Sequence, residues 1–288
     1  MKERYISIAS GNVTLSAILH TPAKDNATDT HDTGVLIIVG GPQYRVGSHR
    51  QFVKLSRFLA MHHIPSMRLD SSGMGDSSGK RVAFYQQDTD IEAAITSFLQ
   101  HCPQLSNVVL WGLCDAASAI LLQLNQHDPR ISGAILLNPL VRQQHNHATV
   151  MLKHYYLKRL FNRQFWRKML GGDLLLRLSI SELWLAFKQR NAKQAPDTQL
   201  LMTNERNYVP LMLHGWQQFN GHVLVITSGN DLTAQEFLQL CTSDSAWGNC
   251  LQSAQQQHIA PANHTFASKE WRTQVEQYSA DFVLHKAK

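Results

Sequence analysis

Short apolar runs alternate with helical stretches along much of this sequence, and this alternation most narrows what the chain can fold into. The run 34–40 is apolar at nearly every position between its two glycines, as in a parallel strand that is covered on both faces. Further strands are predicted at 65–70, 107–112, 131–138 and 222–228. Apolar residues at helical spacing lie between or after them, at 49–62, 88–99, 116–124 and 233–241. This order predicts βαβ units, a mostly parallel sheet and the α/β fold class.

Two other regions set the predicted domain organisation. Residues 5–10 and 13–21 alternate polar and apolar side chains around Gly11-Asn12, which predicts an antiparallel hairpin. Between 142 and 218 the sequence has apolar helical stretches and no convincing strand. We therefore expect a core domain formed by 1–141 and 219–288, with a helical cap inserted at 142–218. A weak strand candidate lies near 249–258, and the last helix is predicted at 268–284.

The turn Gly112-Leu113-Cys114-Asp115-Ala116 lies between a predicted strand and a predicted helix. Small residues two positions before and two after a central nucleophile are what a tight strand–turn–helix elbow requires. A helix N-terminus favours the thiolate, which is the attacking form of a cysteine. The alternative is a buried cysteine in an ordinary turn, and this is our interpretation of Cys102, Cys241 and Cys250. Ser118 lies one helical turn later and is expected to pack or to bond a carbonyl.

An acid and a base for this nucleophile follow in the chain. Asp231 comes just after the strand at 222–228, where it could orient a histidine or simply cap the next helix. His264 lies in the loop before the last helix, and its place in the chain distinguishes it from the other histidines. The order Cys114, Asp231, His264 is the nucleophile–acid–base order of one hydrolase architecture. The predicted catalytic residues are therefore Cys114, Asp231 and His264.

Glycine-rich turns follow the first two core strands. The backbone N–H groups of Gly41 and Asp115 are the predicted donors of an oxyanion hole, whereas Pro42 has no amide hydrogen. The alternative for the first turn is a plain Gly-Pro turn. The second turn, 70–77, lacks the Gly-Lys-Ser/Thr ending of a phosphate-binding loop and is interpreted as a bend over the sheet end.

The charge distribution limits the range of partners. The formal net charge is +6, and residues 142–219 hold 12 Lys/Arg against 4 Asp/Glu. This segment is either an amphipathic helix with a solvated charged face or a basic surface for an anionic carrier, a polyanionic glycan or a membrane face. No nucleic-acid recognition module is visible, so nucleic acid is not an expected partner. The cysteines and histidines lack zinc-like spacing, so no metal and no cofactor are expected. We see no export signal or spanning segment and expect a cytoplasmic protein.

The same segments resemble the α/β-hydrolase superfamily, whose Asp-x-x-Gly-x-Gly-x-Ser loop is similar to 70–77 and whose Asp-His-x-Phe stretch is similar to 263–266. The strings 40–50, 111–118 and 153–157 more closely resemble the family called exosortase A system-associated hydrolase 1. That resemblance implies a link to bacterial exopolysaccharide and exosortase-dependent protein sorting. Val39 stands where most superfamily members have histidine, which puts the support of the oxyanion loop in question. The cysteine nucleophile also resembles that of dienelactone hydrolase.

The expected activity is cleavage of an ester or thioester of a small-molecule or acyl substrate through a Cys114 acyl-enzyme, that is, an esterase or thioesterase. The alternative is a non-catalytic or acyltransferase-like accessory that binds a glycan or lipid intermediate. The identity of the substrate and the oligomeric state stay open.

Overall fold

The computed structural model of the protein describes residues 1–23, 31–141 and 203–286. Residues 1–141 and 203–288 form one compact unit, and residues 142–202 are not part of this unit. Residues 142–202 of the predicted cap at 142–218 therefore lie outside the described residues, as does most of the basic segment.

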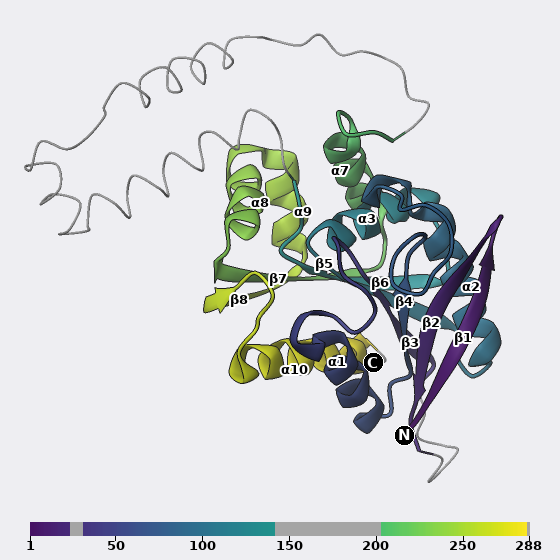
Figure 1. Ribbon diagram of the computed structural model, residues 1–288. Coiled ribbons are helices and arrows are strands. Elements are labelled where there is room, and N and C mark those ends of the chain that lie inside the picture. Colours follow the sequence, from purple (N-terminus) through teal and green to yellow (C-terminus); the bar gives the residue numbers. More distant parts are fainter. Residues whose placement is uncertain (24–30, 142–202, 287–288) are drawn as a thin grey trace, which may run out of the picture. The chain divides into compact units, whose positions relative to one another are not determined.

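The described unit is built on an eight-stranded sheet with the order β1-β2-β4-β3-β5-β6-β7-β8 (Figure 1). β1 pairs antiparallel with β2, and β2 with β4, whereas all pairs from β4 to β8 are parallel. The strands are β1 (Lys2–Ser10), β2 (Val13–Thr21), β3 (Thr33–Ile38), β4 (Ser66–Asp70), β5 (Asn107–Leu113), β6 (Ile131–Leu137), β7 (His222–Asn230) and β8 (Gln255–Asn263). All residues of β3 and β4 are buried. Burial explains the apolar run in β3, whereas β4 also buries the polar residues Ser66, Arg68 and Asp70.

Helices cover both faces of this sheet (Figure 1). One face carries α1 (Gln51–Met61) and α10 (Lys269–Lys286), which lie side by side. The other face carries α2 (Asp88–His101), α3 (Asp115–Gln123), α7 (Tyr208–Gln218), α8 (Leu232–Ser243) and α9 (Ser245–Ser253). Short 3₁₀ turns are found at Ser48–Arg50, Phe84–Gln86 and Leu124–Gln126. Each face encloses its own apolar core against the sheet.

The predicted fold class is confirmed, and the predicted hairpin is β1 and β2, joined across Gly11. Two boundaries differ from the prediction. Part of the weak strand candidate at 249–258 is the end of α9, and β8 begins only at Gln255. Residues 208–218, expected in the cap, form α7, which packs on α3 within the sheet unit. Its apolar side chains Val209, Met212 and Trp216 are buried in the core on that face, which holds the helix there.

In the part of the chain that the structure describes, no helix is both long and apolar enough to cross a bilayer.

Candidate active site

The carboxyl ends of the parallel strands bring the predicted site residues to one edge of the sheet. Cys114 directly follows β5, and Asp231 and His264 directly follow β7 and β8. Because these strands are parallel and neighbours in order, their ends meet at the same edge. Residues distant in sequence therefore converge on one site.

Cys114 sits at a strained turn between β5 and α3. Its φ of 62° and ψ of −121° lie outside the regions that L-residues readily adopt. The turn is held from both sides, since the Cys114 N–H donates to the Leu137 carbonyl on β6 at 2.8 Å. A Cβ on Gly112 would come within 2.7 Å of the Ala116 carbonyl carbon, so only glycine fits there. The predicted elbow geometry is thus present at the predicted residue.

The other serine and cysteine candidates for a nucleophile are buried in the fold. Ser118 is fully buried and donates to the Leu140 carbonyl at 2.7 Å, which ties α3 to the segment after β6. Cys102, Cys241 and Cys250 are buried, and burial raises the pKa of each thiol, to about 11 for Cys102 and about 12 for Cys241. Cys114 alone among the four thiols is partly exposed.

Asp231 and His264 meet in the structure. The Oδ2 atom of Asp231 lies 2.9 Å from Nδ1 of His264, and the carboxylate is 8% exposed while the imidazole is 36% exposed. This separation is within hydrogen-bonding distance. The same Oδ2 accepts from the Ala234 N–H at 3.1 Å and caps α8. Both interpretations of Asp231, as a helix cap and as a partner of His264, therefore describe one carboxylate.

The environment of His264 favours its protonated form. Asp231, and then Cys114, raise the pKa of His264 to about 10, and they outweigh the opposing effect of burial. The contribution of Cys114 places the thiol next to the ring. At neutral pH the imidazole of the folded protein therefore carries a proton between a carboxylate and a sulfur.

Replacing Asp231 by asparagine should return the pKa of His264 from about 10 towards its ordinary value near 6.5. A raised pKa contributes stability that is complete below about pH 6.5 and is lost as the pH rises through about 10. The variant should therefore lose less stability than the wild type between these pH values. An NMR titration measures the pKa, and the resonance missing in His264→Gln identifies the ring.

Asp244→Asn is the matched control for this titration. Asp244 caps α9 by accepting from the Ala246 and Trp247 N–H groups, as Asp231 caps α8. It should leave the pKa of His264 unchanged. An equal change in both variants would mean that lost helix capping, and not the carboxylate beside the ring, causes the effect.

The predicted oxyanion donors are not free in this structure. The Gly41 N–H donates to Oδ2 of Asp115 at 2.8 Å. The N–H groups of Asp115 itself and of Ala116 also stabilise this carboxylate and act to lower its pKa, although burial has the larger effect and raises it. A Cβ on Gly40 would lie 1.9 Å from the other carboxylate oxygen, which explains the glycine at that position. The sequence predicted the two amides but did not predict that the Asp115 carboxylate accepts hydrogen bonds from them.

Asn138, which the sequence analysis did not single out, supports the base loop. It is fully buried at the end of β6 and has a φ of 44°. Its Nδ2 atom donates to the Ser228 hydroxyl at 2.9 Å and to the His264 carbonyl at 3.2 Å, and its Oδ1 accepts from the Ser228 N–H at 2.9 Å. Asparagine tolerates the left-handed region of backbone conformation. The sequence signal that could have identified Asn138 is its position just after a core strand.

A buried carboxylate fixes the loop that continues from Gly41. Asp70, at the end of β4, is fully buried and accepts from the Arg45 N–H at 2.6 Å and the Asp76 N–H at 3.1 Å. The Arg45 guanidinium pairs with both Asp70 and Asp76. A Cβ on Gly75 would meet the Asp70 carboxylate at 2.1 Å. The turn at 70–77 thus wraps around its own first residue, in keeping with a structural turn.

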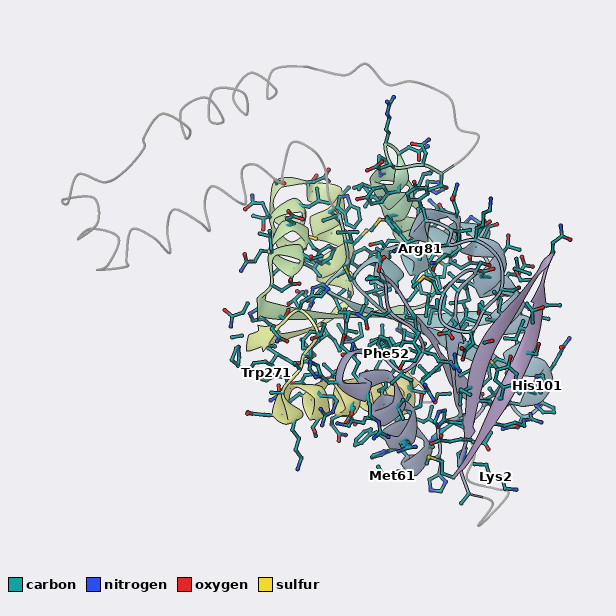
Figure 2. The ribbon with its side chains drawn as sticks, in the orientation of Figure 1. Lys2, Phe52, Met61, Arg81, His101 and Trp271 are labelled. Carbon is teal, nitrogen blue, oxygen red and sulfur yellow. The ribbon has the colours of Figure 1, made fainter. Side chains whose placement is uncertain are left out.

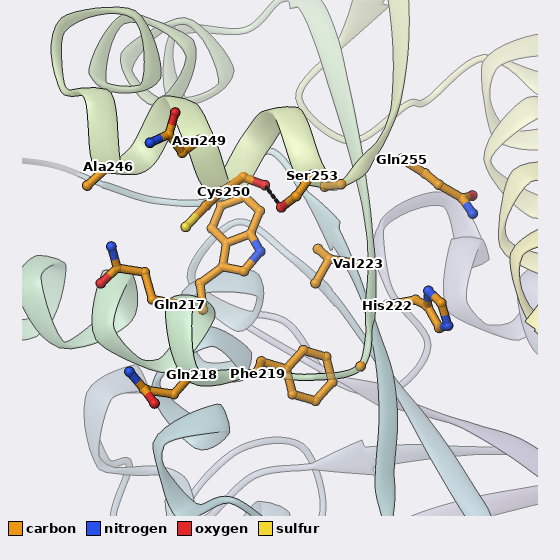
Figure 3. A pocket seen from close by; sticks show the side chains of 13 residues that line it. Gln217, Gln218, Phe219, His222, Val223, Ala246, Asn249, Cys250, Ser253 and Gln255 are labelled. Carbon is orange, nitrogen blue, oxygen red and sulfur yellow. Dashed lines mark hydrogen bonds between the residues drawn. The ribbon is translucent and has the colours of Figure 1, made fainter.

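Two cavities lie at different ends of the sheet. One of 300 Å³ adjoins the elbow and is lined by Gly41, Met74, Arg81, Val82, Ala83, Phe84, Gln87 and Asp115. A larger one of 450 Å³ lies between α7, α9 and the start of β7, where His222 and Val223 line it (Figure 3). Because β7 runs from His222 to Asn230, this second cavity is a full strand length from Asp231. Of these two cavities, the smaller one adjoins the site.

Solved structures with the same architecture were found by comparison. Est1E from Butyrivibrio proteoclasticus, solved with ferulic acid bound, aligns over 98% of this chain and 100% of its own, with 17% identity and a TM-score of 0.62. The Pyrococcus furiosus esterase Pf2001 covers 99% of this chain and 91% of its own, with 14% identity and a TM-score of 0.64. The α/β hydrolase GrgF from Penicillium sp. sh18 covers 98% of both chains, with 17% identity and a TM-score of 0.59.

The chain has the α/β-hydrolase fold. No family model matches its sequence, and no curated protein matches it either. At 17% identity or less, the solved structures establish the α/β-hydrolase architecture, and the chemistry has to be argued from the site itself.

Proposed function

We propose that this α/β-hydrolase-fold protein cleaves an ester or thioester through an acyl-enzyme intermediate on Cys114. The observation that supports this most directly is that three functional groups lie together at one edge of the sheet. A partly exposed cysteine in a strained elbow adjoins His264, and His264 lies 2.9 Å from the buried Asp231. A nucleophile, a base and an orienting carboxylate in this order are the parts of a catalytic triad.

In the proposed reaction, His264 is the protonated partner of the Cys114 sulfur, and this sulfur attacks the carbonyl carbon of the substrate. The tetrahedral intermediate collapses, its bond to the leaving group breaks, and His264 returns the proton to the leaving oxygen or sulfur. Water then attacks the Cys114 thioester while His264 accepts one of its protons. Release of the carboxylic acid frees the Cys114 sulfur and leaves the proton on His264, as at the start of the cycle. Asp231 stabilises the imidazolium in both halves of the cycle.

The solved esterases that share this architecture support an ester-cleaving function. The wider role that we propose is in bacterial exopolysaccharide or exosortase-dependent sorting systems, and it rests on the sequence resemblance given above. A cytoplasmic location, and an anionic carrier or membrane face for the basic segment 142–219, are proposed on the charge pattern.

The test is intact-mass spectrometry after brief exposure to a panel of activated thioesters. Wild-type protein should gain one acyl group, and Cys114→Ala should gain none. Cys250→Ala, which removes a buried thiol on α9, is the control and should acylate like the wild type. A wild type without an adduct, or an equal adduct on Cys114→Ala, would contradict the proposal and favour a non-catalytic binding role.

A further inference from the structure

We propose that Asp115 is a specificity-determining residue, which selects substrates that carry a hydroxyl group next to the ester. The Asp115 carboxylate holds the oxyanion donors, and it releases them when the hydroxyl group of the substrate binds to the carboxylate. The inference rests on the proposed function and names the class of substrate for the same site. Three observations carry it: the occupied Gly41 N–H, the adjoining cavity, and the polar groups that line this cavity.

The first observation is that the Asp115 carboxylate accepts a hydrogen bond from the Gly41 N–H, one of the two donors proposed for the reaction's oxyanion. The Gly41 N–H is 2.8 Å from Oδ2 of Asp115, and the Asp115 N–H also acts on that carboxylate. These are the two amides expected to stabilise the tetrahedral intermediate. A substrate carbonyl oxygen can use them only after the carboxylate has left, so a substrate that offers Asp115 another hydrogen bond has an advantage.

The second observation is that space for such a group adjoins the carboxylate. Both Asp115 and Gly41 line the 300 Å³ cavity. Its wall between residues 81 and 87 includes Phe84, which packs edge-on against Tyr85 and Tyr208. The cavity therefore has room for a small substrate group beside the nucleophile.

The third observation is the balance of donors and acceptors in this cavity. Gln87 is only 6% exposed, and its Oε1 atom has no hydrogen-bond partner, so it requires a donor. Asp115 likewise only accepts when it is charged. Arg81, labelled in Figure 2, lines the same cavity, and its positive charge acts on Asp115.

These groups distinguish between substrate classes. Two acceptors call for donors on the ligand, which disfavours a plain alkyl chain and an anionic group. The guanidinium of Arg81 disfavours an ammonium group. A neutral hydroxyl donates to Asp115 or Gln87 and can accept from Arg81, so a hydroxylated or polyol-like substrate fits all three.

The experiment compares kcat/KM for matched substrates that differ only in hydroxyl groups. The pairs are butyryl and hydroxybutyryl thiophenyl esters, and propyl butyrate and glyceryl monobutyrate. Wild type should prefer the hydroxylated member of at least one pair by about tenfold or more. Asp115→Ala should lose this preference because turnover of the plain ester rises, since the donors are then free. Asp115→Asn should show an intermediate preference.

Two further variants separate selection from stability. Asp88→Ala removes an acidic residue from the first turn of α2, as Asp115→Ala does in α3, and should leave the preference unchanged. Gln87→Met should raise KM for the hydroxylated ester more than it raises KM for the plain ester. Equal preference ratios in wild type and Asp115→Ala would overturn the inference while leaving the Cys114 chemistry intact. Failure of every ester to acylate Cys114 would contradict the proposed function itself.

Discussion

Replacing Cys114 by alanine is expected to lower kcat for an activated thioester on the order of 10⁴-fold or more, and adding His264→Ala should lower it little further. The two side chains adjoin and act in one proton transfer, so their effects should not add. Steady-state kinetics on the two single variants and the double variant measure this. Cys241→Ala, another buried thiol, is the control and should keep its activity. Full additivity of the two effects would contradict a shared step.

The same geometry gives an expectation for Cys114→Ser. A serine hydroxyl needs a neutral base to remove its proton, but Asp231 has the largest part in raising the pKa of His264, which reaches about 10 in the wild type. The serine variant should therefore lose about 100-fold or more of the rate at neutral pH. The protonated ring therefore disfavours a serine nucleophile at this position. A serine variant with wild-type activity would contradict that interpretation.

Replacing Asp70 by asparagine is expected to lower the free energy of unfolding by about 3 kcal/mol. The carboxylate is fully buried, pairs with Arg45 and accepts two backbone N–H groups, so its loss leaves a largely buried guanidinium with one partner fewer. Urea denaturation of the wild type and the variant, with the m-value compared, gives this difference.

Asp76→Asn provides the matched control, because Asp76 pairs with the same Arg45 guanidinium but is 69% exposed. Its loss should cost less than about 1 kcal/mol. If both substitutions cost the same, burial of Asp70 is not what fixes the loop. Because Arg45 follows Gly41 by only four residues, Asp70→Asn should also reduce acylation of Cys114 in protein that is still folded.

Local patterns predicted the strands whose burial is continuous or alternates, but they missed the start of β8 and the unit to which α7 belongs. The core strands β3, β5, β6 and β7 are buried over most of their length and contain continuous apolar runs. β8 is an edge strand whose first residues, Gln255–His258, are polar and largely exposed, so no apolar run marks its start. α7 has the apolar periodicity of a helix, but periodicity does not say which unit buries its apolar side.

The sequence by itself determined the fold class, the elbow at Cys114 and the order of the three candidate catalytic residues, because these follow from neighbours within a few positions. Only the tertiary structure decided the contacts between residues far apart in the chain. Asp115 takes the Gly41 N–H 74 residues away, and Asn138 holds the His264 carbonyl across 126 residues. The physical reason is that parallel strands bring their ends together in three dimensions, so the carboxylate that follows Cys114 can accept a hydrogen bond from an amide in the loop after β3.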